Sequence, residues 1–116
     1  MAFEFSLKLS RRYEEFRRRW RDYAEVIKGL AKEFFKENFL STYVFGSTVG
    51  SDYRALSDID VAIVLKRDVD EFVRVKFRSL VRERLSKVHP FEIHIITEDE
   101  WRNWYRRFIK EDYVEI

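Results

Sequence analysis

The run Val-Ala-Ile-Val-Leu at residues 61–65 decides the fold. Together with Ile59 and Asp60 before it, this mostly β-branched run predicts a strand over residues 59–65. A strand with one wet face would alternate polar and apolar residues, so an unbroken apolar run indicates burial on both faces. We therefore expect residues 59–65 to lie inside a small sheet that has helices packed on it.

Two further strands flank this run in the sequence. Thr42-Tyr43-Val44-Phe45 is a short β-branched and aromatic run that Gly46 ends, and residues 47–57 are polar. Pro90 breaks the chain before a third apolar run over residues 91–96. The sequence thus predicts a sheet of about three strands.

Three segments have helical periodicity. Residues 10–37 read as one long amphipathic helix that Asn38 closes as a left-handed cap. Asp68 and Glu71 predict a capping box for a helix to about Ser86, and Thr97 and Glu100 predict another for a last helix. That last helix has a strongly apolar face made of Trp101, Trp104, Tyr105 and Phe108.

The order of elements predicts an α+β fold in two or three layers. The connection between the second and third strands contains a helix and should be a right-handed parallel crossover. The connection between the first and second strands is about a dozen residues with little room for a helix, so it allows antiparallel pairing. We expect a small mixed sheet covered by helices.

Composition excludes several classes of protein. The 116 residues fit a single domain, 1–116, and the absence of Cys rules out disulfides and thiolate zinc sites. With 23 Lys and Arg against 21 Asp and Glu, the net charge of +2 argues against a dedicated nucleic-acid binder. The apolar runs are too short for a membrane span, and the charged start lacks a signal peptide. We expect a cytoplasmic protein without membrane contact.

The pair Asp58 and Asp60 at the start of the second strand is the first feature that indicates chemistry. A period of two places both carboxylates on one face, about 7 Å apart between Cα atoms. At that separation they repel by roughly 2 kcal/mol at an effective dielectric near 20. A divalent cation would relieve this repulsion, because Mg²⁺ prefers carboxylate oxygens. The simpler alternative makes Asp58 a turn residue and pairs Asp60 with an arginine such as Arg54.

The turn after the first strand is the second feature. Gly46, Ser47, Thr48 and Gly50 lie where the strand ends. Glycines let backbone N–H groups approach an anion closely, and a helix that started at Ser47 would point its N-terminus at a phosphate. The same residues are also compatible with an ordinary loop.

Glu92 within the third strand is the third feature. A glutamate inside an apolar strand is uncommon unless it is paired or bound to a metal. If the third strand lies beside the second, Glu92 faces the same site as Asp60, and His94 shares its side. A hydrogen-bonded core histidine is the simpler interpretation of His94.

Together these features resemble the nucleotidyltransferase domain of the DNA polymerase beta superfamily, in particular its minimal nucleotidyltransferase branch. The resemblance covers nearly the whole chain and is most specific over residues 45–65, FGSTVGSDYRALSDIDVAIVL. It implies the nucleotidyltransferase fold in one minimal domain, 1–116. It also implies that Asp58, Asp60 and Glu92 are the catalytic, metal-binding residues. Binding of the triphosphate is expected at Gly46, Ser47, Thr48 and Gly50, with Arg54 added as a substitute for a family arginine.

The resemblance implies a Mg²⁺-dependent enzyme, with Mn²⁺ as the alternative ion, that transfers a nucleoside monophosphate to an acceptor hydroxyl. The favoured reaction moves AMP from ATP onto a helical HEPN-type partner in a toxin–antitoxin-like pair; a homo-oligomer is the other candidate assembly. The family turn G-S-x-A-R-G has an arginine at its fifth position, where this chain has Gly50 followed by Ser51. Arg54 is the candidate substitute. This departure favours an alternative, an antitoxin-like binding subunit with little turnover. Nucleotidylation of a small molecule of the aminoglycoside type is a third alternative.

Overall fold

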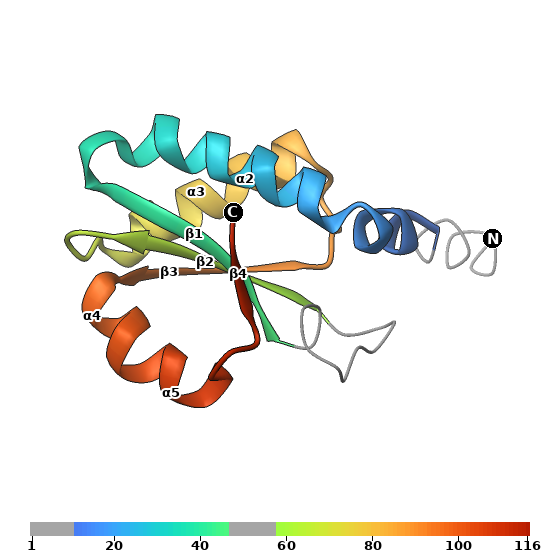
Figure 1. The fold of residues 1–116 in the computed structure, drawn as a ribbon. Helices are drawn as coiled ribbons and strands as arrows, with labels where there is room; N and C mark the ends of the chain where they lie inside the picture. The colour runs from blue at the N-terminus through green and yellow to red at the C-terminus, as the bar shows by residue number, and fades with distance from the viewer. Residues whose placement is uncertain (1–10, 47–57) are drawn as a thin grey trace.

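The sheet is the centre of the structure. The computed structural model describes residues 11–46 and 58–116, and within them four strands form one sheet in the order β3-β2-β1-β4. The strands are β1 (Phe39–Phe45), β2 (Ile59–Leu65), β3 (Phe91–Thr97) and β4 (Tyr113–Glu115). β2 pairs antiparallel with β1 and parallel with β3. The expected α+β fold with a mixed sheet is confirmed (Figure 1).

Strand β4 was not predicted, so the sheet has one strand more than the sequence indicated. β4 pairs antiparallel with the end of β1, with Val114 opposite Val44 and Tyr113 opposite Phe45. Three residues are too few to show an alternating pattern, and they are extended because the edge of β1 offers hydrogen-bond partners. β1 itself begins at Phe39, three residues earlier than predicted, and ends before Gly46 as expected.

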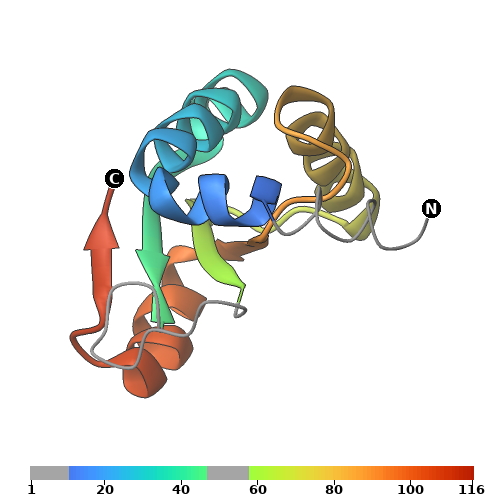
Figure 2. The ribbon, with the colours of Figure 1, turned by 90° about the vertical axis from the view of Figure 1, so that its right-hand side faces the viewer.

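Helices cover both faces of the sheet. On one face lie α2 (Trp20–Phe35) and α3 (Glu71–Arg84), side by side (Figures 1 and 2). On the other lie α4 (Glu98–Glu100), the π-helical turn η3 (Trp101–Tyr105) and α5 (Arg106–Ile109). This arrangement gives three layers, with β2 in the middle of the central one.

The burial of β2 follows the sequence prediction. Every residue from Val61 to Leu65 is at most 1% exposed. Val61, Ile63 and Leu65 pack in the core beneath α2 and α3, whereas Ala62 and Val64 pack against Trp101 on the opposite face. The two faces of β2 therefore carry two separate apolar clusters, as the unbroken run indicated.

The predicted single helix over residues 10–37 is wrong in detail. Residues 11–18 are helical, but Arg19 forms a turn (φ −109°, ψ 33°) before α2 begins at Trp20. The turn brings Phe16 to 4.7 Å from Tyr23 and 6.0 Å from Phe91, ring centre to ring centre. Aromatic packing on the start of β3 therefore overrides helical continuity. Among the described residues no helix combines the length and apolar character that crossing a bilayer requires.

The end of α2 also differs from the prediction. The residue with positive φ is Lys36 (φ 53°), and residues Lys36–Asn38 form the short 3₁₀ turn η1. Asn38 has another role, because its side chain donates to the carbonyl of Arg67 at 3.0 Å and accepts from the Arg67 N–H at 2.8 Å. Asn38 thus ties the start of β1 to the residues that follow β2.

The two predicted capping boxes have different outcomes. α3 is capped by Asp70, whose Oδ1 accepts from the Val73 N–H at 2.9 Å, and not by Asp68. Asp68 instead accepts from the Val69 N–H and pairs with Arg74. The box of the last helix is confirmed. The Thr97 hydroxyl accepts from the Glu100 N–H at 3.3 Å, and the Glu100 carboxylate accepts from the Thr97 N–H at 3.1 Å.

Strand β3 lies at one edge of the sheet, and arginines from α3 cover its outer side. Arg78 donates through Nε and Nη2 to the carbonyl of Ile93, at 3.3 and 3.1 Å. Arg74 donates through Nε to the carbonyl of Ile95 at 3.2 Å. These guanidinium groups occupy acceptors that a sheet edge would otherwise leave unpaired.

Candidate active site

Asp60 is the one acidic residue within β2. Its neighbours Ile59 and Val61 are fully buried under α2 and α3. The strand's period of two turns Asp60 the other way, toward the face that α4, η3 and α5 cover. The Asp60 side chain is 27% exposed. β2 thus holds a carboxylate at a fixed, half-buried position on the smaller helical face.

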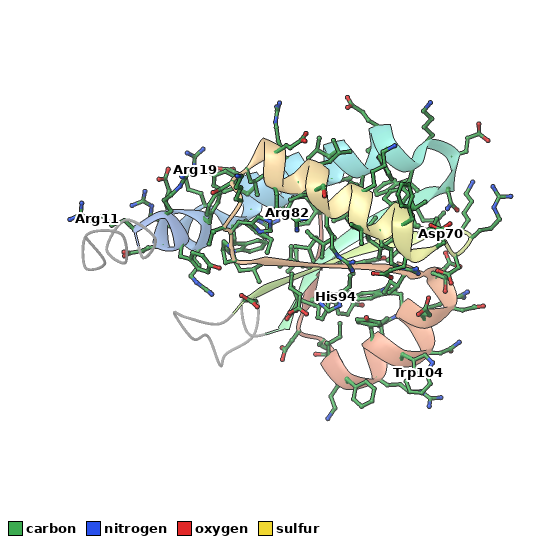
Figure 3. All side chains as sticks on the ribbon, turned by 180° about the vertical axis from the view of Figure 1, so that it is seen from behind. Arg11, Arg19, Asp70, Arg82, His94 and Trp104 are labelled. Atoms are coloured by element: carbon green, nitrogen blue, oxygen red, sulfur yellow. The ribbon has the colours of Figure 1, made fainter. Side chains whose placement is uncertain are left out.

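Glu92 lies directly opposite Asp60. The parallel register of β2 and β3 pairs Asp60 with Glu92 and Ala62 with His94. Glu92 is 56% exposed, and His94, two residues further, is on the same face at 22%. The prediction that the third strand lies beside the second and turns Glu92 and His94 toward Asp60 is confirmed. Figure 3 shows His94 on the side of β3 that faces α4 and α5.

His94 lies next to both carboxylates. Its Nε2 is 3.0 Å from Asp60 Oδ1 and 3.9 Å from Glu92 Oε1. A carboxylate only accepts hydrogen bonds, so the Nε2–H of His94 donates to Asp60. The one N–H on Nε2 is therefore given to Asp60, and Glu92 lies beyond hydrogen-bond distance of it.

Tyr105 holds the other side of the imidazole. Its Oη is 3.3 Å from His94 Nδ1, and its ring lies 5.5 Å from the imidazole ring, centre to centre. Burial raises the pKa of the Tyr105 phenol above its ordinary value of 10.0, and nearby carboxylates raise it further. Tyr105 therefore keeps its proton at neutral pH and donates it to Nδ1. The sequence showed Tyr105 only as part of an apolar helix face, and no local signal marked it as a site residue.

The cluster fits a divalent cation. One donor atom from each of Asp60, Glu92 and His94 lies within 4.8 Å of the others. Carboxylate oxygens and imidazole nitrogens are common ligands of divalent ions. All three groups are supplied by two adjacent, well-buried strands, so their separation is fixed by the sheet.

Gly46 lies against the same carboxylate. It has φ +88°, a conformation that favours glycine, and a Cβ at this position would be 2.9 Å from Asp60 Oδ2. Gly46 therefore lets the backbone turn after β1 and leaves room for Asp60. The sequence predicted Gly46 at the candidate site, and the structure brings it there.

Comparison with known proteins identifies the family of this chain. A family profile described as "Nucleotidyltransferase domain" matches residues 27–116, which include β1, β2, β3 and every residue of the cluster. The chain belongs to the nucleotidyltransferase domain family. This match confirms the resemblance inferred from residues 45–65.

Individual relatives of this nucleotidyltransferase domain agree with the family. The spectinomycin 9-adenylyltransferases of Staphylococcus aureus strains Mu50 and N315 are each 27% identical over 95 residues, which cover 73% of this chain and 36% of theirs. The chain thus spans about a third of the length of these curated relatives. A crystal structure described as an inferred nucleotidyltransferase is 36% identical, with a TM-score of 0.59 over 79% of this chain and 95% of its own.

Other residues of the predicted site lie apart from the cluster or outside the described ranges. Asp58 is exposed just before β2, and its charge acts on His89. The structure does not bring Asp58 into the group of ligand atoms formed by Asp60, Glu92 and His94. Ser47, Thr48, Gly50 and Arg54 lie outside the described residues, so their roles in the nucleotidyltransferase domain stay predictions.

Two hollows adjoin the cluster. One of about 340 Å³ opens along the edge of β3, where Glu92 and His94 share its wall with Arg78 and Arg82. The other, about 470 Å³, is mainly apolar and runs from Phe45 and Tyr105 to Trp104 and Phe108 on the last helix. Trp104 and Phe108 are 64% and 76% exposed. The nucleotidyltransferase domain therefore offers a polar hollow lined by Glu92 and His94, and an apolar one lined by Phe45 and Tyr105, which both contact His94.

Proposed function

We propose that this chain transfers a nucleoside monophosphate, AMP from ATP, to an acceptor hydroxyl with the help of a divalent cation, Mg²⁺ or Mn²⁺. The observation that carries the proposal is the register of β2 and β3, which sets Asp60 and Glu92 side by side in a chain of the nucleotidyltransferase domain family. Paired carboxylates at this spacing suit phosphoryl and nucleotidyl transfer.

The reaction forms one bond and breaks one. The acceptor oxygen bonds to the α-phosphorus, the bond between the α- and β-phosphates breaks, and pyrophosphate leaves with the negative charge. When bound, the cation offsets the charge of the triphosphate and makes the acceptor hydroxyl more acidic. Asp58, Asp60 and Glu92 are the residues we assign to hold it.

The chain's own groups position the reactants. Glu92, the most exposed carboxylate of the cluster, accepts the proton of the acceptor hydroxyl. We assign binding of the β- and γ-phosphates to Gly46, Ser47, Thr48, Gly50 and Arg54. His94 keeps the Asp60 carboxylate in one orientation through its 3.0 Å hydrogen bond.

Labelled nucleotide tests the proposal directly. Purified protein is incubated with α-labelled ATP and Mg²⁺ or Mn²⁺, with candidate acceptor proteins and with spectinomycin in separate reactions. We expect transfer that Asp60→Asn reduces at least about 1000-fold, because loss of a charged group on the reaction centre costs about 4 kcal/mol. Asp112→Asn, a carboxylate outside the cluster, is the matched control. Transfer that Asp60→Asn leaves unchanged would remove the proposal.

We assign acceptor binding in part to the exposed aromatic side chains of the last helix. Trp101 and Tyr105 pack on the sheet, whereas Trp104 and Phe108 are exposed and line the 470 Å³ hollow. Figure 3 shows Trp104 on the last helix. Exposed large aromatics near a site are typical of interaction surfaces. We propose a helical HEPN-type protein as the partner that covers them.

A double substitution tests this surface. Trp104→Ser with Phe108→Ser should weaken binding of the partner protein at least about 100-fold, since such anchors often contribute 2 kcal/mol or more each. Phe72→Ser is the matched control, because Phe72 is 75% exposed on α3, on the opposite face of the sheet. Surface plasmon resonance measures both. Equal loss of binding in the control would show that the effect is not specific to the last helix.

One specific observation favours a second function. Gly50 and Ser51 stand where the family turn has arginine and glycine, which favours an antitoxin-like subunit that binds its partner with little turnover. The two functions separate in the same assays. Partner binding that survives Asp60→Asn, with no label transfer to any acceptor, supports the binding subunit and excludes the enzyme.

A further inference from the structure

We propose that His94 is a further ligand of the divalent cation, beside the carboxylates of Asp60 and Glu92, and that the site therefore selects transition-metal ions such as Zn²⁺ and Mn²⁺ over Mg²⁺. The proposal rests on the proposed function, because it names the class of ion that the same site takes. It concerns a residue that the carboxylate motif does not include.

The distances within the cluster fit this role. His94 Nε2 lies 3.0 Å from Asp60 Oδ1 and 3.9 Å from Glu92 Oε1. Neighbouring ligands around an ion at about 2.1 Å are themselves about 3 to 3.5 Å apart, from the octahedral and tetrahedral angles. The imidazole is therefore about as far from each carboxylate as a fellow ligand would be, with only a small shift needed at Glu92.

Tyr105 is an independent observation that points to a ligand. Histidines that bind metals normally have their second ring nitrogen fixed by a hydrogen bond, which sets the tautomer and the direction of the ring. Here the Tyr105 hydroxyl lies 3.3 Å from His94 Nδ1. The ring of Phe45, 5.3 Å away between centres, packs on the same imidazole. Tyr105 and Phe45 therefore fix the orientation of the His94 ring and leave Nε2 directed at the carboxylates.

The hydroxyl of Tyr105 can serve both states of the imidazole. Without an ion, the tyrosine O–H donates to Nδ1 and the Nε2–H donates to Asp60. With an ion on Nε2, the proton resides on Nδ1 and donates to the tyrosine oxygen, because a hydroxyl both donates and accepts. Tyr105 is thus a positioning residue that suits a change of tautomer in His94.

The donor set determines the preference for the ion. Mg²⁺ favours oxygen ligands and retains its water, whereas imidazole nitrogen suits Zn²⁺ and other transition metals. Carboxylates alone would favour Mg²⁺ or Mn²⁺. Adding one nitrogen raises the affinity for transition metals and does little for Mg²⁺.

Titration calorimetry with the metal alone tests the selectivity. In nucleotide-free protein we expect His94→Ala to weaken Zn²⁺ binding about 10- to 100-fold and to change Mg²⁺ binding less than about 3-fold. Tyr105→Phe should weaken Zn²⁺ binding by a smaller factor. His89→Gln, which alters the other histidine, is the matched control and should leave both affinities unchanged. Equal Zn²⁺ affinity in wild type and His94→Ala would overturn the proposal.

Nitrogen NMR of the wild-type protein gives a second readout. It does not depend on whether a variant at the ligand site folds. The chain has only two histidines, so their imidazole signals are assigned with His89→Gln. Addition of Zn²⁺ should move the His94 signals and convert them from the Nε2–H to the Nδ1–H tautomer, with His89 unaffected. Zn²⁺ binding without any change at His94 would overturn the proposal.

The outcomes distinguish this proposal from the proposed function. Neither measurement contains nucleotide or acceptor. His94-dependent Zn²⁺ binding without label transfer would support the metal site and remove the transferase. Label transfer that needs Asp60, together with Zn²⁺ binding that His94→Ala leaves unchanged, would support the transferase and remove the metal-ligand role of His94.

Discussion

At the scale of single residues, the contact between Gly46 and Asp60 connects a backbone conformation to a candidate ligand. The turn after β1 needs φ +88°, and the missing Cβ leaves the space that Asp60 Oδ2 occupies. A side chain at residue 46 would both strain the turn and push on the carboxylate. Gly46 therefore combines two requirements that the sequence shows only as one glycine at the end of a strand.

Gly46→Ala should lower both the stability of the protein and its transfer activity. We expect a loss of about 1–2 kcal/mol in the free energy of unfolding from the left-handed conformation, and at least about a 10-fold loss of transfer from displacement of Asp60. Urea denaturation and the labelled-ATP assay measure the two effects. Full stability and full transfer in Gly46→Ala would contradict this account of the turn.

At the scale of residues, part of the candidate site could be predicted from the sequence and part could not. Asp60 and Glu92 were predictable, because an acidic residue inside an apolar strand is conspicuous and one parallel pairing brings the two together. The link from Asp60 through His94 to Tyr105 was not, because Tyr105 comes from a different layer. Its position depends on how the last helix docks on the sheet, which no local pattern of residues encodes.

At the scale of elements, Gly29 is an interior helix residue of α2 without a structural reason for being glycine. It is exposed, and a Cβ there would meet no atom of the described residues within 4 Å. Gly29→Ala should therefore raise the free energy of unfolding by about 0.5–1 kcal/mol, because alanine restricts the unfolded chain and favours the helix. Urea denaturation tests it. The same substitution is the matched control for Gly46→Ala, and destabilisation by Gly29→Ala would contradict the prediction.

The capping box of the last helix supports the layer that carries Tyr105. Thr97→Ala removes the hydroxyl that accepts from Glu100 and should cost about 1 kcal/mol of stability. It should also loosen Tyr105 and so weaken Zn²⁺ binding. Asp70→Ala removes the comparable cap of α3, and we expect a similar loss of stability with Zn²⁺ affinity unchanged. Chemical denaturation and calorimetry measure both variants; matching losses of Zn²⁺ affinity would argue against the link to Tyr105.

Features that local sequence determines were predicted well, and those decided by tertiary contacts were not. The apolar run of β2 and the capping box at Thr97 follow from local sequence alone. The turn at Arg19 depends on the packing of Phe16 against Phe91, far away in the sequence. β4 depends on an open edge of β1. For α3, Asp68 and Asp70 both precede the helix, and the pairing of Asp68 with Arg74 leaves Asp70 as the cap.

At the scale of the whole molecule, His89 makes stability depend on pH. Burial lowers the pKa of His89 below its ordinary value of 6.5, the charge of Arg82 lowers it further, and Asp58 offsets part of the shift. The unfolded chain therefore binds a proton at this histidine before the folded protein does. The part of the free energy of unfolding that depends on neutral His89 is fully present above pH 6.5. It is lost as the pH falls through the lowered pKa of the folded protein.

The expected result is a free energy of unfolding that decreases as the pH falls below 6.5. Urea denaturation of wild type and His89→Gln between pH 7.5 and 5 measures it. His89→Gln should show a shallower decrease, since glutamine takes up no proton in either state. Identical slopes in the two proteins would mean that His89 does not contribute.

The arginine cover of β3 restricts how this molecule can assemble. β3 is an edge strand and also carries Glu92 and His94, yet Arg74 and Arg78 already engage the carbonyls of Ile95 and Ile93. A second chain therefore cannot extend the sheet there by adding a strand without displacing two guanidinium groups. Any partner that reaches this edge has to recognise side chains, among them the exposed carboxylate of Glu92.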